Sequence, residues 1–176
     1  MLSKSFVLFM FSVVFLNAGT IVGQIYQIRD GDTMDFQTEQ GILTCRVLGI
    51  DTPEKYESNK LIKEANKFGI DASMIVNAGE LATSYAYEYF SSNLVYALDI
   101  DGQDRYGRNL CIISDERGSY NENIVADGYS VVYKNGKYIK DRALRHKLQV
   151  AQGNAVKANS GLWADFKILM KKMANN

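Results

Sequence analysis

Apolar and polar residues alternate in five short stretches of the chain, which is the pattern of strands with one buried face. Turn-forming residues separate these stretches, such as the Asp30-Gly31 pair after the first and the polar segment 101–107 before the last. The pattern predicts strands at 21–28, 33–38, 42–50, 94–100 and 108–114.

Three other segments predict helices. One at 80–90 is rich in Ala and Tyr, and one at 141–158 places four apolar residues on a single stripe: Leu144, Leu148, Ala151 and Ala155. Between them, Ser119 and Glu122 have the spacing of a capping box, which predicts a short helix that Gly128 ends.

Residues 55–78 are polar and show only an irregular helical pattern, so we expect a partly helical, mobile excursion beside the functional site. Five strands, with helices after the third and after the fifth, predict an α+β fold. Its main part is a five-stranded OB-fold β-barrel with three helices.

The first 19 residues are expected to be a secretory signal peptide. Lys4 precedes an apolar run at 6–16, and Asn17-Ala18-Gly19 supplies the small residues of a cleavage site. This run is much shorter than the roughly 20 residues that a membrane-spanning helix needs. We therefore expect a mature domain at 20–176 that is periplasmic, held in the cell envelope or secreted. We also expect this domain to have no stable membrane association after signal cleavage, and we take a monomer as the default.

The net charge of the chain does not favour binding of a polyanion, because the chain has 20 basic and 20 acidic residues. Positive potential must then be concentrated locally. A basic run at 134–147 contains six Lys or Arg residues and the single acid Asp141, although such a run is more often a solvated face. Substrate binding is expected to be weak and salt-sensitive.

The two cysteines and the single histidine exclude several kinds of site. Cys45 and Cys111 lie in apolar, strand-like surroundings; export permits a disulfide, but we favour two small core residues. His146 is the only histidine, so a zinc site lacks ligands and a histidine-based triad is excluded.

Carboxylates at strand ends indicate a site for a hard cation. Asp30 and Asp32 are two residues apart, so an extended backbone points both the same way, while Asp51 ends the third strand. Pro53 favours extended geometry at Thr52, which can turn its carbonyl toward the cation that Asp51 binds. Too few protein oxygens are present to fill a calcium shell, so water and substrate would complete it. The glycine and glutamate of an EF-hand loop are absent.

Arginines beside a cation site point to a phosphodiester substrate. Arg46 and Arg108 suit bidentate phosphate contacts, and Glu54 is placed to act as general base or to position water. Strict alternation would put Arg46 and Asp51 on opposite faces, so the hypothesis requires a bulge or twist at Gly49.

Together these motifs resemble the staphylococcal-type thermonucleases, the SNase-like domain family. The resemblance spans roughly residues 20 to 165. It rests on Asp30-Gly31-Asp32-Thr33, Arg46 through Glu54, Asp104-Arg105-Tyr106-Gly107-Arg108, the Asn121-Glu122 helix that ends at Gly128, and Gly161-Leu162-Trp163.

The resemblance implies calcium-dependent, largely sequence-independent hydrolysis of DNA and RNA that leaves 3′-phosphates, with Ca²⁺ as cofactor. By position, Asp32, Asp51 and the Thr52 carbonyl would hold the metal. Arg46, Glu54 and Arg108 would be catalytic, Tyr106 would contact a substrate phosphate, and Asp30 would support the metal ligands from behind.

Two features depart from the better-known members of the family: the length of the 55–78 excursion and the absence of strong positive charge. Tyr133 or Tyr138 could stack on bases, as aromatic residues do in OB-folds that bind single strands. The alternatives are a non-catalytic OB-type binding module and a protein that only stores or senses calcium. The complete set of active-site residues disfavours the first, and the two arginines disfavour the second.

Overall fold

The computed structural model describes residues 20–176, and the predicted signal peptide lies outside these residues. The elements along the chain are β1 (Thr20–Ile28), β2 (Thr33–Thr38), β3 (Gly41–Val47), β4 (Ile50–Asp51), α1 (Asn59–Phe68), α2 (Ala72–Tyr89), β5 (Val95–Gln103), β6 (Asn109–Asp115), β7 (Gly118–Ser119), α3 (Tyr120–Ala126), β8 (Val131–Val132), the 3₁₀ turn η1 (Tyr133–Gly136), α4 (Arg142–Ala158), α5 (Leu162–Asp165) and α6 (Lys167–Ala174).

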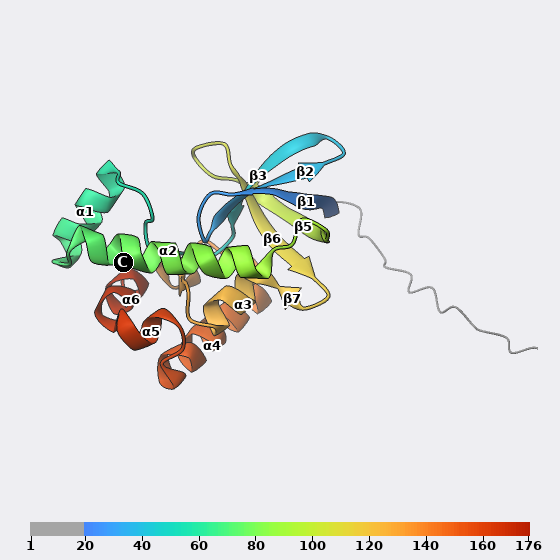
Figure 1. Ribbon diagram of the computed structural model, residues 1–176. Coiled ribbons are helices and arrows are strands. Elements are labelled where there is room, and N and C mark those ends of the chain that lie inside the picture. The colour runs from blue at the N-terminus through green and yellow to red at the C-terminus, as the bar shows by residue number, and fades with distance from the viewer. Residues whose placement is uncertain (1–19) are drawn as a thin grey trace, which may run out of the picture.

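Five strands form the predicted closed barrel (Figure 1). They follow the order β3-β2-β1-β5-β6 with antiparallel neighbours, and a parallel pairing of β3 with β6 closes the barrel. Closure leaves no free edge between the first and last strands. The fold is therefore an α+β OB-type barrel, as the sequence predicts.

The predicted third strand, 42–50, is interrupted rather than continuous. β3 ends at Val47, and Gly49 adopts a φ of +83°, a conformation that residues with a side chain rarely adopt. The chain then resumes as β4, which leaves the barrel and pairs with β8. This break supplies the twist that the sequence hypothesis requires at Gly49.

The three predicted helices are present as α2, α3 and α4, with one correction at α3. The Ser119 side chain makes no capping hydrogen bond to this helix, so the predicted capping box does not form. Ser119 is held in β7, where it pairs with Ser114, and its hydroxyl contacts Asn121 instead. The stripe predicted on α4 is buried throughout.

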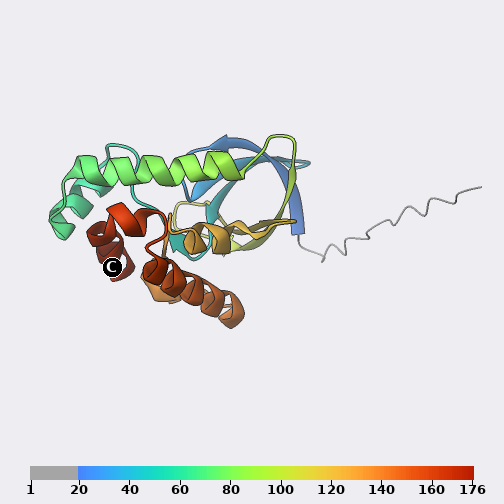
Figure 2. The same cartoon turned by 60° about the horizontal axis from the view of Figure 1, so that its bottom comes forward.

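The 55–78 excursion is partly helical, as expected: it forms α1 and the beginning of α2. Its mobility stays a prediction. Figures 1 and 2 show α1 at the end of α2 that lies away from the barrel, above α5 and α6. Apolar residues of these helices form a second core around Trp163, Leu169 and Met170, apart from the aromatic core that Phe36, Tyr96 and others build inside the barrel. Helix α2 contributes to both cores and so joins the two parts.

Cys45 and Cys111 form a disulfide, which corrects the expectation of two unbridged core residues. Both are fully buried, but they lie on β3 and β6, the two strands whose parallel pairing closes the barrel. Their Cα atoms are 5.5 Å apart, within the ordinary range for a disulfide. The bridge reinforces the closure beside Arg46.

None of the helices within residues 20–176 is both long enough and apolar enough to span a bilayer.

Candidate active site

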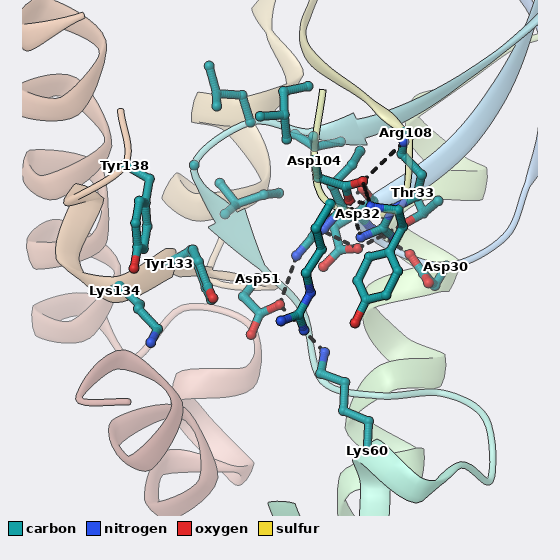
Figure 3. A pocket seen from close by; sticks show the side chains of 18 of the residues that line it. Asp30, Asp32, Thr33, Asp51, Lys60, Asp104, Arg108, Tyr133, Lys134 and Tyr138 are labelled. Carbon is teal, nitrogen blue, oxygen red and sulfur yellow. Dashed lines mark hydrogen bonds and ion pairs between the residues drawn. The ribbon is translucent and has the colours of Figure 1, made fainter. Parts of the chain in front are cut away.

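A cleft of about 870 Å³ opens at one end of the barrel, between the strand ends, α1 and η1 (Figure 3). Nearly all of the site residues predicted from the sequence line it: Asp30, Asp32, Arg46, Asp51, Glu54, Tyr106, Arg108 and Tyr133. Segments up to a hundred residues apart in the chain thus meet in one place. The remaining predicted residue, Thr52, is buried directly behind Asp32.

Arg46 joins the two predicted metal carboxylates. Its Nη1 lies 2.5 Å from Asp32 Oδ1, and its Nη2 lies 2.8 Å from Asp51 Oδ1. Their proximity depends on the break at Gly49, because an unbroken strand would send Arg46 and Asp51 to opposite faces. Both carboxylates therefore face the same small region, with all three side chains largely buried.

The Asp30–Thr33 turn is fixed by bonds from three directions. Asp32 Oδ2 accepts hydrogen bonds from the Thr52 amide, at 2.8 Å, and from its hydroxyl, at 2.9 Å. Asp30 Oδ1 accepts from the Asp32 amide at 3.0 Å, and the Tyr120 hydroxyl donates to the Gly31 carbonyl at 2.7 Å. Asp32 is thus rigidly held, with its other oxygen turned toward Arg46.

The two acids of this turn differ in their protonation. Burial raises the pKa of Asp30 to about 7, and the neighbouring charge of Asp32 adds to this effect. Burial also opposes the charge on Asp32, but the Arg46 guanidinium and the Thr52 amide outweigh it and hold the Asp32 pKa below its ordinary value. Of the two acids in this turn, Asp32 is therefore the one that ionises more readily.

The second arginine is presented by the tight turn between β5 and β6. Asp104 Oδ2 accepts from Arg108 Nε at 2.8 Å and contacts Nη2 at 2.7 Å, while its Oδ1 accepts from the backbone amides of Tyr106 and Arg108. Arg108 Nη1 donates to Thr33 Oγ1 at 3.3 Å, which places the guanidinium beside the Asp32 turn. The Arg108 guanidinium also lies over the ring of Tyr106, 5.6 Å from its centroid.

Glu54 lines the cleft, and two features that the sequence interpretation did not identify hold it there. One is Gly79 of α2, whose lack of a side chain lets the helix approach the Pro53–Glu54 backbone closely. The other is Lys60 of α1, which contacts the Glu54 carboxylate. Glu64 of α1 also lines the cleft. The sequence signal for Lys60 and Glu64 was limited to the scattered Lys and Glu residues of 55–78, which do not indicate that these two side chains enter the cleft.

An aromatic pair faces these groups across the cleft. The rings of Tyr133 and Tyr138 stack with centroids 5.9 Å apart, and both remain partly exposed beside Lys134 (Figure 3). A stacked, exposed pair next to a cation suits the flat face of a base and its phosphate. A role in substrate binding stays a prediction for both tyrosines.

The donor set fits a hard cation such as Ca²⁺, which prefers oxygen ligands. Asp32 and Asp51 offer buried carboxylate oxygens on one small region, and the Thr52 amide and hydroxyl hold Asp32 Oδ2 in place. Within residues 20–176, no group of three or more His, Cys, Asp or Glu side chains is arranged to hold a metal by itself. A bound cation would therefore depend on water or substrate for the rest of its shell.

Comparison with known proteins gives a family match. A family model described as "staphylococcal nuclease homologue" matches residues 44–165, more than half of the chain. Asp30 and Asp32 precede that span, whereas Arg46, Asp51, Thr52, Glu54 and Arg108 lie within it.

Curated relatives are similar at low identity. A protein of Escherichia coli O157:H7 named "uncharacterized endonuclease" is 29% identical over 160 residues, covering 90% of this chain and 87% of its own. The thermonuclease of Staphylococcus hyicus is 23% identical over 149 residues, with 85% and 79% covered. An uncharacterized protein of Methanocaldococcus jannaschii is 27% identical over 151 residues, with 80% and 70% covered. On the family match, which the barrel and the cleft support, the chain belongs to the staphylococcal nuclease homologue family.

Proposed function

We propose that the protein is an exported, calcium-dependent nuclease that hydrolyses phosphodiester bonds of DNA and RNA with little sequence preference and leaves 3′-phosphate products. The observation that carries the proposal is the convergence of two arginines, two buried carboxylates and Glu54 in one cleft. The relatives named thermonuclease and endonuclease support the same reaction class. Export rests on the signal-peptide pattern of Lys4, the apolar run at 6–16 and the small residues Asn17-Ala18-Gly19.

Each residue has a role that its surroundings allow. Asp32, Asp51 and the Thr52 carbonyl would hold Ca²⁺, which when bound neutralises charge on the phosphate and orients water. Arg46 and Arg108 would bind the phosphate oxygens and strengthen those contacts as negative charge develops. Glu54, held at the edge of the cleft, would accept a proton from the attacking water or position that water.

The chain's own ion pairs indicate what substrate binding must change. Arg46 is engaged by both Asp32 and Asp51, so a phosphate can bind this guanidinium only when it exchanges some of these bonds. Arg108 is held by Asp104 through Nε and Nη2, which leaves Nη1 as the donor nearest the Asp32 turn. The aromatic pair Tyr133 and Tyr138 would hold a neighbouring base, and this favours single strands.

Digestion of single-stranded DNA by the purified domain 20–176, with calcium or with chelator, tests the proposal. Replacing Glu54 by Gln and Arg108 by Gln should each lower kcat by about 10² or more, because each removes a group that acts in the transition state. Glu57→Gln, a change at an exposed carboxylate three residues from Glu54, is the matched control. An absence of calcium-dependent cleavage, or full activity in the Glu54→Gln, Arg108→Gln double variant, would refute the proposal.

A further inference from the structure

Helix α1 brings a lysine into the cleft. Ser58 caps the helix by accepting a hydrogen bond from the Leu61 amide at 3.1 Å, and Leu61 and Phe68 anchor it in the second core. Lys60, the second residue of the helix, therefore projects from a fixed backbone toward Asp51 (Figure 3).

Three carboxylates converge on the Lys60 ammonium: two from the 51–54 segment and one from the next turn of α1. Its Nζ contacts Glu54 Oε1 and lies 3.8 Å from Glu64 Oε1 and 3.9 Å from Asp51 Oδ1. Partial burial lowers the pKa of Lys60, but the charge of Asp51 and the bond to Glu54 outweigh it, so the ammonium stays charged.

An ordinary surface ion pair is the competing interpretation of Lys60, since its side chain is 53% exposed. Its partners argue against that interpretation. The side chains of Asp51, Glu64 and Glu54 are only 13%, 14% and 24% exposed, and all three line the cleft. The ammonium thus neutralises charge inside the site and not on the outer surface.

We propose that Lys60 is a positioning residue with two effects on the site. Its ammonium holds the Glu54 carboxylate against the cleft wall, in place to act on water. The same charge, beside Asp51, weakens the attraction of the acidic cluster for a divalent cation. The proposal rests on the proposed function for the first effect, whereas the second can be measured without any catalysis.

Calorimetric titration of the domain 20–176 with CaCl₂ tests the second effect. Lys60→Met removes a positive charge close to Asp51, so calcium should bind about 3- to 10-fold more tightly than in the wild type. Lys63→Met is the matched control: Lys63 lies on the same helix, is exposed and is not part of the cleft lining. Calcium affinity in this control should match that of the wild type.

Steady-state kinetics on a short single-stranded oligonucleotide at saturating calcium test the first effect. Lys60→Met should lower kcat about tenfold with KM within about twofold of the wild type, because Glu54 loses its anchor but no substrate contact is removed. Lys60→Arg, which keeps the charge, should recover most of kcat.

Two results would overturn the proposal. The first is a calcium affinity and a kcat in Lys60→Met that both equal those of Lys63→Met. The second is a rise in KM with kcat unchanged, which would make Lys60 a substrate-binding residue. A wild-type domain that does not cleave at all would refute the proposed function and leave the calcium titration to decide the effect on cation affinity.

Discussion

Gly79, in the interior of α2, offers a sharp test of how Glu54 is positioned. A Cβ added at Gly79 would lie 2.6 Å from the Glu54 carbonyl oxygen and 2.7 Å from the Pro53 carbonyl oxygen. Both neighbours are backbone atoms and cannot rotate away. The helix and the Pro53–Glu54 segment must therefore separate by roughly 0.8 Å before ordinary van der Waals contact is restored.

The consequences of Gly79→Ala for stability and for activity differ in size. Alanine favours the helix over glycine by about 1 kcal/mol, while the overpacking costs about 1–3 kcal/mol, so the net loss of stability is about 0–2 kcal/mol. A displacement of the Glu54 backbone approaching 1 Å can lower the rate of a positioned reaction about 10²-fold. Activity should thus fall far more than stability.

The assay compares kcat for single-stranded DNA with the midpoint of urea unfolding in the same preparations. Gly153→Ala is the matched control, because Gly153 lies within α4 and an added Cβ there would meet no atom within 4 Å. It should gain about 1 kcal/mol of stability with unchanged kcat. A Gly79→Ala variant with wild-type kcat and a folded, cooperative transition would show that the close approach does not position Glu54.

Three further predictions concern the bridge, one acid and the basic run. Reducing the Cys45–Cys111 disulfide, which spans 66 residues, should lower the free energy of unfolding by about 4 kcal/mol, and unchanged urea unfolding once both thiols are free would contradict this. Burial raises the pKa of Glu64 to about 7, so the folded state binds its proton more tightly than the unfolded chain; stability from this group is complete below about pH 4.5 and is lost as pH rises through 7. Glu64→Gln should remove that loss, which is measured as the change in the free energy of urea unfolding between pH 4.5 and pH 7. An equal change in the variant and the wild type would contradict this prediction. Lys134→Gln should reduce the salt slope of oligonucleotide binding in chelator by about 0.7, whereas the exposed Lys171→Gln should leave it unchanged; equal slopes would exclude a phosphate contact.

The sequence predicts the barrel and most of the cleft because the signals there are local. Alternation and turn residues define each strand within a few positions. The extended backbone expected at Asp30–Asp32 is instead a bend, and its carboxylates are placed by hydrogen bonds, among them those that Thr52 donates to Asp32. The meeting of Arg46 with Asp51 is predictable only as a requirement on Gly49, and the positive φ of that glycine meets it. The roles of these residues in catalysis stay predictions.

Other features depend on contacts that no local pattern encodes. Cys45 and Cys111 become neighbours only because β3 and β6 pair in parallel to close the barrel, so spacing could not distinguish a bridge from two core residues. Helix α1 is ten residues long and buries only Leu61 and Phe68, which pack in the second core. The sequence alone therefore does not predict Lys60 as a site residue, because its position in the cleft depends on that packing.

The balance of charge in the cleft suggests how a chain with no net positive charge could bind a polyanion. The charged residues of the lining are six acids and five bases: Asp30, Asp32, Asp51, Glu54, Glu64, Asp104, Arg46, Lys60, Arg105, Arg108 and Lys134. The lining alone thus offers a phosphate chain little net attraction, and most of its cations are already paired with carboxylates. One divalent cation at Asp32 and Asp51 would reverse this balance and would also compete with Arg46 for both acids, which frees the guanidinium for the phosphate. Calcium should therefore raise the affinity for oligonucleotides as well as the rate of cleavage, and binding measured with the Glu54→Gln variant separates the two effects. Equal affinity in calcium and in chelator would refute this account of the charge balance.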